Sequence, residues 1–118
     1  MTLRSSHEKP VYVRIREVIA DATLAGRYAD GDPLPSVRAL AAEQGANPLT
    51  VAKAYQGFQD EGFIIVKRGV GMFVAPGARA RLRESERTAF VRDEWPLVRE
   101  RMKRLGIDAE DLLKRERA

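Results

Sequence analysis

The sequence predicts a mainly α-helical protein with one small β-hairpin and a short helical tail. Three observations lead to this fold class. Apolar residues recur at helical spacing along much of the chain, glycines follow several of these stretches, and one β-branched stretch leads into a basic, glycine-containing turn. With 118 residues, 44% of them hydrophobic, the chain can form one compact domain with an appendage but has no room for a large second domain.

The composition excludes several classes of site. The chain has no cysteine, so it forms neither disulfides nor thiolate metal sites, and its single histidine, His7, has no partner pattern for catalysis or metal binding. We therefore expect a protein that is not an enzyme and that uses no cofactor and no metal ion. No stretch is apolar for long enough to be a signal peptide or a membrane span, so we expect a cytoplasmic protein without membrane contact.

The first helix is expected to begin near Pro10, after a flexible arm over residues 1–9, and to end before Gly26. Its spacing predicts a buried face formed by Val11, Ile15, Val18, Ile19 and Ala22. The opposite face, expected to point mainly to water, carries Arg14, Arg16, Glu17 and Asp21. This helix is expected to be a scaffold.

Two further helices are separated by a short turn. After a loop rich in Asp, Gly and Pro, Ser36 can cap a helix that ends near Gln44, with Leu40 and Ala41 on its core side. A second cap, Asn47, precedes a helix from about residue 48 to 61, in which proline fits the first helical position. Its inward face is expected to consist of Val51, Ala54, Tyr55 and Phe58.

A β-hairpin is expected after Gly62. Residues 63–66 are apolar and mostly β-branched, residues 67–71 form a basic glycine-containing turn, and residues 72–74 return. Two helices, a turn and a hairpin in this order are typical of a winged helix-turn-helix, a DNA-reading module. The net charge of +4 and a pI of about 9.8 suit a polyanionic partner, although that surplus is common among soluble domains.

Three groups of residues are candidates for DNA contact. Ser36 and Arg38 can anchor a phosphate at a helix start, although capping and an ordinary surface arginine would also explain them. The outward residues at the start of the third helix can reach base edges, the alternative being a solvated face; they are Asn47, Leu49, Thr50 and Lys53. The hairpin tip can approach a phosphate or the minor groove, the alternative being a plain charged turn; its residues are Lys67, Arg68 and Gly69.

The tail is expected to hold a long charged helix over residues 78–105, kinked near residues 92–95 by Pro96, and a short final helix capped by Asp108. An apolar seam with 4-3-4-3 spacing runs along the long helix and is typical of helices that pair. The seam consists of Val91, Trp95, Val98, Met102 and Leu105, with Phe90 and Leu97 widening it. We expect it to form a homodimer; packing on the winged domain is the alternative.

The motifs L-P-S-V-R-A-L-A, T-V-A-K-A-Y, E-G and G-V-G-M-F-V resemble the pattern of the GntR family of bacterial transcription regulators. The resemblance covers residues 10–76 and implies a winged domain there, with residues 77–118 as a dimerisation tail. So short a tail, together with Asn47-Pro48, resembles the YtrA-type branch. That resemblance implies a dimeric repressor that binds a palindromic, inverted-repeat operator, often beside transporter genes of the ATP-binding-cassette type.

Carried over by position, the resemblance implies a phosphate contact for Arg38, a helix-start contact for Thr50 and a minor-groove approach for Gly69. Two arginines that long-tailed members use for DNA contacts fall on Pro48 and Ala52, so their readout does not transfer. Leu49 replaces a residue that is usually polar in the short branch. It can contact a thymine methyl group or pack against its neighbours.

Two alternatives to a sequence-specific regulator stay open from sequence. One is a protein-interaction module or antirepressor that pairs through the tail, and the other is a non-specific DNA binder whose affinity collapses with salt. A small-molecule effector is not identified. The tail leaves little room for an enclosed pocket of about 300 Å³, so an effector would be expected at the dimer interface.

Overall fold

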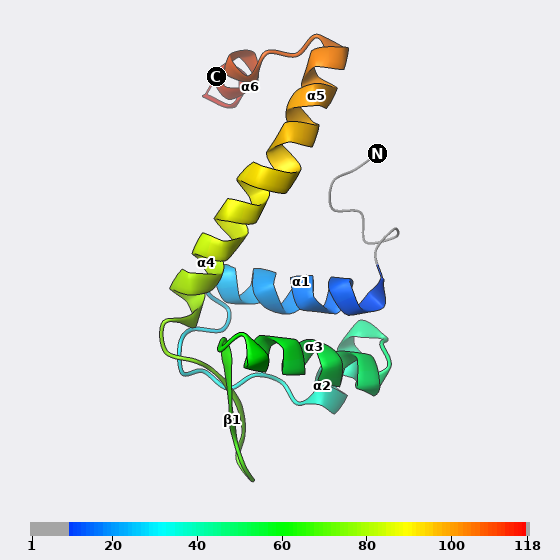
Figure 1. Cartoon of the computed structure of the whole chain (residues 1–118), viewed down its shortest axis with the longest axis vertical. Helices are drawn as coiled ribbons and strands as arrows, with labels where there is room; N and C mark the ends of the chain where they lie inside the picture. The colour runs from blue at the N-terminus through cyan, green and yellow to red at the C-terminus, as the bar shows by residue number, and fades with distance from the viewer. Residues whose placement is uncertain (1–9, 118) are drawn as a thin grey trace. The chain divides into compact units, whose positions relative to one another are not determined.

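A computed structural model describes residues 10–117 (Figure 1), and the expected arm, residues 1–9, lies outside them. The elements in chain order are α1 (Val11–Leu24), α2 (Val37–Gln44), α3 (Pro48–Asp60), β1 (Ile64–Lys67), β2 (Gly71–Val74), α4 (Ala78–Ala89), a π-helical turn η1 (Phe90–Glu94), α5 (Trp95–Leu105) and α6 (Ala109–Arg117). The expected mainly helical fold with a two-stranded antiparallel hairpin is confirmed. The described residues form two compact units, one up to Glu84 and one from Ser85 onward.

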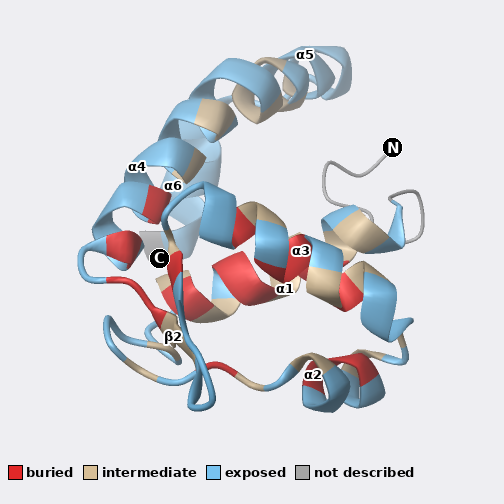
Figure 2. Cartoon of the chain, turned by 60° about the horizontal axis from the view of Figure 1, so that its bottom comes forward, coloured by how far each residue is buried: buried red, intermediate tan, exposed pale blue. Residues whose placement is uncertain are grey.

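The first unit, called the winged unit below, is built around α1 and α3 (Figure 2). Ile15 of α1 and Val51 of α3 are completely buried. The predicted inward face of α3 and both predicted core residues of α2 are confirmed, since each of these side chains is buried. Local periodicity sufficed for these two helices because each packs one stripe against the same core.

The expected buried face of α1 was partly wrong. Val11 is 42% exposed, and Val18 and Ala22 are only half-buried. The buried residues of α1 are Ile15, Ile19, Ala20 and Thr23. Thr23 tolerates burial because its hydroxyl donates a hydrogen bond of 2.8 Å to the Ile19 carbonyl oxygen.

Arg16 was also expected to face water and is half-buried instead. Its guanidinium lies 4.2 Å from the centre of the Phe58 ring and donates to both carboxylate oxygens of Glu61, at 3.0 and 2.7 Å. A planar guanidinium can stack on an aromatic ring and bind a carboxylate at once. Arg16 therefore ties α1 to the end of α3.

The two strands of the hairpin begin and end within one residue of their expected limits. Strand β1 pairs with β2 from Ile64 opposite Val74 to Lys67 opposite Gly71, so Phe63 precedes the strand and Lys67 lies within it. The loop before α2 runs along β2, where Leu34 N–H donates to the Met72 carbonyl oxygen at 2.8 Å. This third, strand-like segment fixes the hairpin to the start of α2.

Helix α4 begins inside the winged unit, because Ala78 and Leu82 are buried in its core. The Asp30 carboxylate accepts from the backbone N–H groups of Gly77 and Arg79, at 2.8 and 3.3 Å. The Arg79 guanidinium donates to the Leu24 carbonyl oxygen at 3.0 Å. The boundary was expected after residue 76, whereas the two units divide after residue 84. The first turns of α4 account for the difference.

The interruption expected before Pro96 is present as the turn η1. Proline has no N–H group to donate, so the regular hydrogen-bond ladder cannot continue through it. Trp95 N–H donates instead to the Phe90 carbonyl oxygen, five residues earlier, which is the π-helical pattern. The expected single kinked helix is therefore two α-helices joined by one wider turn.

Candidate nucleic-acid interface

The start of α2 is held in place by a hydrogen bond from α3. The Tyr55 hydroxyl donates to the Pro35 carbonyl oxygen at 2.7 Å, and burial raises the pKa of Tyr55, so that the hydroxyl keeps its proton. The Ser36 hydroxyl oxygen accepts from Ala39 N–H at 3.1 Å, which confirms the predicted cap. The first backbone N–H groups of α2 thus have a fixed direction.

Arg38 lies in the first turn of α2 and is exposed. Within residues 10–117 its guanidinium forms no hydrogen bond and no ion pair, and the residue is exposed. An unpaired arginine beside a helix N-terminus is suited to a phosphate group, because the helix dipole and the guanidinium attract the same anion. Ser36 lies next to it and can still donate its hydroxyl proton.

The start of α3 is defined by its own cap. The Asn47 side-chain oxygen accepts from Leu49 N–H at 2.8 Å, and Pro48 occupies the first helical position, as predicted. Asn47, Leu49 and Lys53 are exposed, whereas Thr50 is only half-exposed. The structure therefore brings all four predicted base-reading residues to the first turns of one helix.

The hairpin tip is a tight turn closed by a hydrogen bond of 2.9 Å from Val70 N–H to the Lys67 carbonyl oxygen. Gly69 has a φ of +75°, which lies in the left-handed region that favours glycine. The two basic residues differ: the Lys67 ammonium lies 4.7 Å from the centre of the Phe73 ring, while Arg68 makes no such contact with the described residues. Arg68 is thus the free cation of this tip.

Two exposed residues on the same elements were missed from sequence. Val70, at the hairpin tip, is 72% exposed. Gln56 lies on α3 three residues after Lys53, and its side-chain amide donates to the Asp60 carboxylate at 2.9 Å. The 4-3 spacing of Leu49, Lys53 and Gln56 was the signal for the latter, because it marks one outward stripe of a helix.

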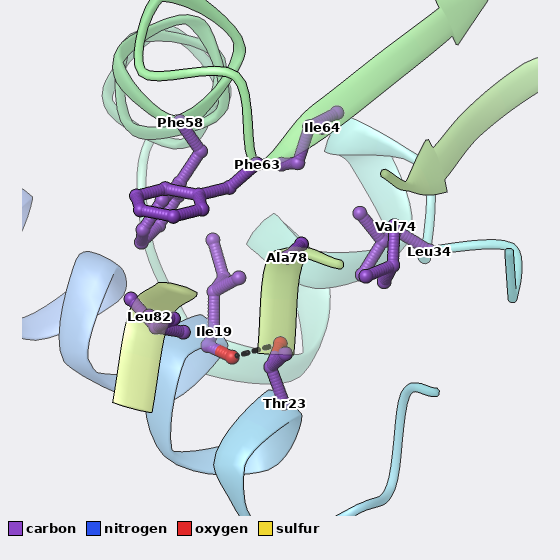
Figure 3. Close-up of a pocket in the computed structure, with 9 residues that line it drawn as sticks. All are labelled: Ile19, Thr23, Leu34, Phe58, Phe63, Ile64, Val74, Ala78 and Leu82. Carbon is purple, nitrogen blue, oxygen red and sulfur yellow. Dashed lines mark hydrogen bonds between the residues drawn. The ribbon is translucent and has the colours of Figure 1, made fainter. Parts of the chain in front are cut away.

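A small apolar cavity lies in the core of the winged unit. A cavity of about 10 Å³ lies between α1, α3, the hairpin and α4, and its nine lining residues are shown in Figure 3. That volume is at the lower limit for a single water molecule, and the lining is almost entirely apolar. In residues 10–117, no cluster of acidic or histidine side chains can hold a metal ion, and no helix has both the length and the apolarity of a membrane span.

A family model described as bacterial regulatory proteins, gntR family, matches residues 11–74. The chain belongs to the GntR family. Over 100 residues it is 38% identical to the HTH-type transcriptional repressor YtrA of Bacillus subtilis, and the alignment covers 85% of this chain and 71% of YtrA. The resemblance to the YtrA-type branch is therefore confirmed, and this GntR-family protein is a DNA-binding transcription regulator.

Several solved structures resemble this GntR-family protein, and two of them are informative. A GntR family transcriptional regulator from Listeria monocytogenes has a TM-score of 0.75 and 26% identity, covering 96% of this chain and 97% of that one. The DNA-binding domain of AraR, solved in complex with operator ORR3, has a TM-score of 0.56 and 25% identity, covering 64% of this chain and 90% of that one. The first likeness extends through the tail, and the second concerns the winged unit bound to DNA.

The tail of this GntR-family protein, from Ser85 onward, contains no residue classed as buried among those that the structure describes (Figure 2). Of the predicted seam, Phe90, Val91 and Leu105 are exposed by 47%, 63% and 58%. Trp95, Val98 and Met102 are half-buried. Trp95 and Met102 also line an open groove of about 480 Å³ that reaches the start of α6 at Ala109.

An ion pair joins two neighbouring residues of this region, Arg92 and Asp93. Arg92 donates to the Asp93 carboxylate at 2.8 Å, and this hydrogen bond lowers the pKa of Asp93 and raises the pKa of Arg92. Both side chains are well exposed, so water and salt screen the pair. The polar contacts of the tail therefore do not replace a hydrophobic core.

Proposed function

We propose that this protein is a homodimeric repressor that binds an inverted-repeat operator through its two winged units. The observation that carries the proposal is the set of side chains at the starts of α2 and α3 and at the hairpin tip, where two caps and a tight turn fix the backbone. The complex of the AraR domain with its operator supports it, because that domain has the same fold. Two related α3 helices would enter successive major grooves about 34 Å apart.

The contacts divide into two kinds. Ser36, Arg38, Arg68 and Gly69 are proposed to hold phosphates or approach the minor groove, since they combine backbone N–H groups with unpaired cations. Asn47, Thr50 and Lys53 are proposed to read base edges, because they lie at the start of the helix that enters the major groove. Lys67, stacked on Phe73, is proposed to support the hairpin and to add charge near the DNA.

The homodimer is proposed to form through the seam of the tail. Apolar side chains exposed along one helical stripe are unfavourable in water, and pairing two copies would bury them. The proposed interface consists of Phe90, Val91, Trp95, Val98, Met102 and Leu105. A small-molecule effector, if the protein has one, is proposed to act at this interface, where the groove beside Trp95 lies.

The regulated genes follow from the YtrA-type resemblance alone. We propose genes for membrane transporters, repressed when the bound dimer blocks RNA polymerase in the cytoplasm. A reporter that fuses the operator-containing promoter to an enzyme would show higher expression when the regulator gene is deleted. Lower expression after deletion would show an activator instead.

The decisive experiment is selection of bound duplexes from a random DNA library with purified protein at physiological salt, followed by sequencing. An enriched inverted repeat is expected, with half-site centres about ten base pairs apart. Sedimentation velocity of the complex with that duplex should give two protomers per DNA. No enrichment, with binding that collapses as salt rises, would favour a non-specific binder; no DNA binding would favour a protein-interaction module that pairs through the tail.

A further inference from the structure

The two most exposed large apolar side chains of the described chain lie on the elements proposed to meet DNA. Leu49, the second residue of α3, is 79% exposed, and Val70, at the hairpin tip, is 72% exposed. Every other large apolar side chain of the described residues is less exposed than these two. Such exposure is unfavourable in water, so a partner that covers Leu49 would bind with a more favourable free energy.

Its own chain covers little of Leu49. Its backbone N–H is held by the Asn47 side chain at 2.8 Å, which fixes the direction of the residue at the helix start. The buried residues of α3 begin with Val51, on another face of the helix. The structure thus removes one of the two roles that the sequence left open for Leu49, namely packing against neighbouring side chains.

The chemistry of the major groove narrows what an aliphatic side chain can recognise there. Base edges in this groove present hydrogen-bond donors and acceptors, to which leucine contributes nothing, and one apolar group, the C5-methyl of thymine. From Pro48 to Tyr55 the helix carries no acidic residue, so it does not repel the phosphates on either side of the groove.

We infer that Leu49 is a specificity-determining residue that contacts the C5-methyl group of one thymine in each operator half-site. This inference rests on the proposed function, since it requires α3 to enter the major groove. It gives the protein a base preference that does not depend on the two arginines that Pro48 and Ala52 replace. It also predicts that the selected half-site contains an invariant thymine.

The test replaces each thymine of the selected operator, one position at a time and in both half-sites, by deoxyuridine. Uracil keeps the base pair and lacks only the methyl group. Replacement of the contacted thymine should raise the dissociation constant of the unaltered protein about fourfold for each half-site. This ratio corresponds to ~0.8 kcal/mol, the contribution of burying one methyl-sized group. For Leu49→Ala the same replacement should change the dissociation constant by less than a factor of two.

Val70→Ala is the matched control. It also shortens an exposed aliphatic side chain on the DNA-facing surface, but the hairpin is proposed to lie at the minor groove, where thymine presents no methyl group. Val70→Ala should therefore keep the full sensitivity to deoxyuridine. Circular dichroism and thermal unfolding of both variants would show that the fold is unchanged.

The outcomes separate this inference from the function on which it rests. An enriched operator that lacks an invariant thymine, or that tolerates deoxyuridine at every position, would overturn the thymine contact and leave the regulator intact. Sensitivity that persists in Leu49→Ala would also overturn it, because another residue would then contact the methyl group. Failure to enrich any sequence would overturn both proposals.

Discussion

The winged unit and the tail are both largely helical, yet they differ in what they bury. All residues classed as buried in the described chain belong to the winged unit, where α1, α2, α3, the hairpin and the first turns of α4 share one core. The apolar side chains that the structure describes in the tail are half-covered or exposed. The proposed pairing of two copies would bury these side chains, whereas the core of the winged unit is buried within one chain.

The largest effect that would sharpen this comparison is expected from Leu105→Glu. In a symmetric dimer the substitution places two carboxylates in the seam, and the loss of two buried leucines should raise the dimer dissociation constant by at least about 100-fold. Operator affinity should fall with it, while thermal unfolding of the winged unit stays unchanged. Sedimentation equilibrium and operator titration would measure the two constants.

Arg104→Gln is the matched control for that experiment. It lies next to Leu105, points away from the seam and changes the net charge by the same amount. It should leave the dimer constant within a factor of about two. If both variants weakened the dimer equally, the seam would not be the dimer interface, and the contrast drawn between the two units would be wrong.

A second, smaller effect is expected from Arg38→Ala in the winged unit. Loss of one charged phosphate contact per protomer should weaken binding to every sequence by at least about tenfold and reduce the salt slope by about one per protomer. Fluorescence anisotropy on operator and random duplexes at several salt concentrations would measure it. Arg83→Ala, which removes the same charge from α4, should have little effect; a similar loss for both would argue that only net charge matters.

Lys53→Ala and Thr50→Ala should mainly alter which bases are preferred. Removing a base contact is expected to reduce discrimination at one position by roughly 1 kcal/mol, about fivefold, while binding to random DNA changes less. Repeating the library selection with each variant would show the relaxed position. Unchanged sequence preference in both variants would place these residues outside the base-reading set.

The smallest effect is expected inside the winged unit from Tyr55→Phe. The Pro35 carbonyl oxygen would lose its partner, which should lower the free energy of unfolding by about 1 kcal/mol and Tm by about 4–8 °C. Differential scanning calorimetry would measure both, and the dimer constant should not change. A change in the dimer constant without a change in Tm would contradict the separation of the two units.

The features that were predictable from sequence are those set by neighbours along the chain. The caps at Ser36 and Asn47, the inward face of α3 and the interruption before Pro96 all depend on residues within one or two turns. For the candidate interface, the same local signals placed the polar residues of α3 on its outward face.

The features that were not predictable depend on distant partners. Arg16 was assigned to water because its helical position is polar, but the Phe58 ring and Glu61 lie 42 and 45 residues further along the chain. The Asp30 carboxylate that caps α4 and the Arg81 guanidinium that donates to the Gly62 carbonyl oxygen at 2.7 Å follow no periodic pattern either. Such contacts exist only once the elements have packed.

The hydrogen bond from Trp95 to Phe90 sets the angular phase of the apolar stripe within the tail. A π turn adds the equivalent of one residue to a helical turn, so it places Phe90, and not Val91, one turn before Trp95. In a regular α-helix Val91, four residues before Trp95, would take that place instead, because one turn contains 3.6 residues. The wider turn therefore determines which side chain of this short segment lines up with Trp95 along the helix.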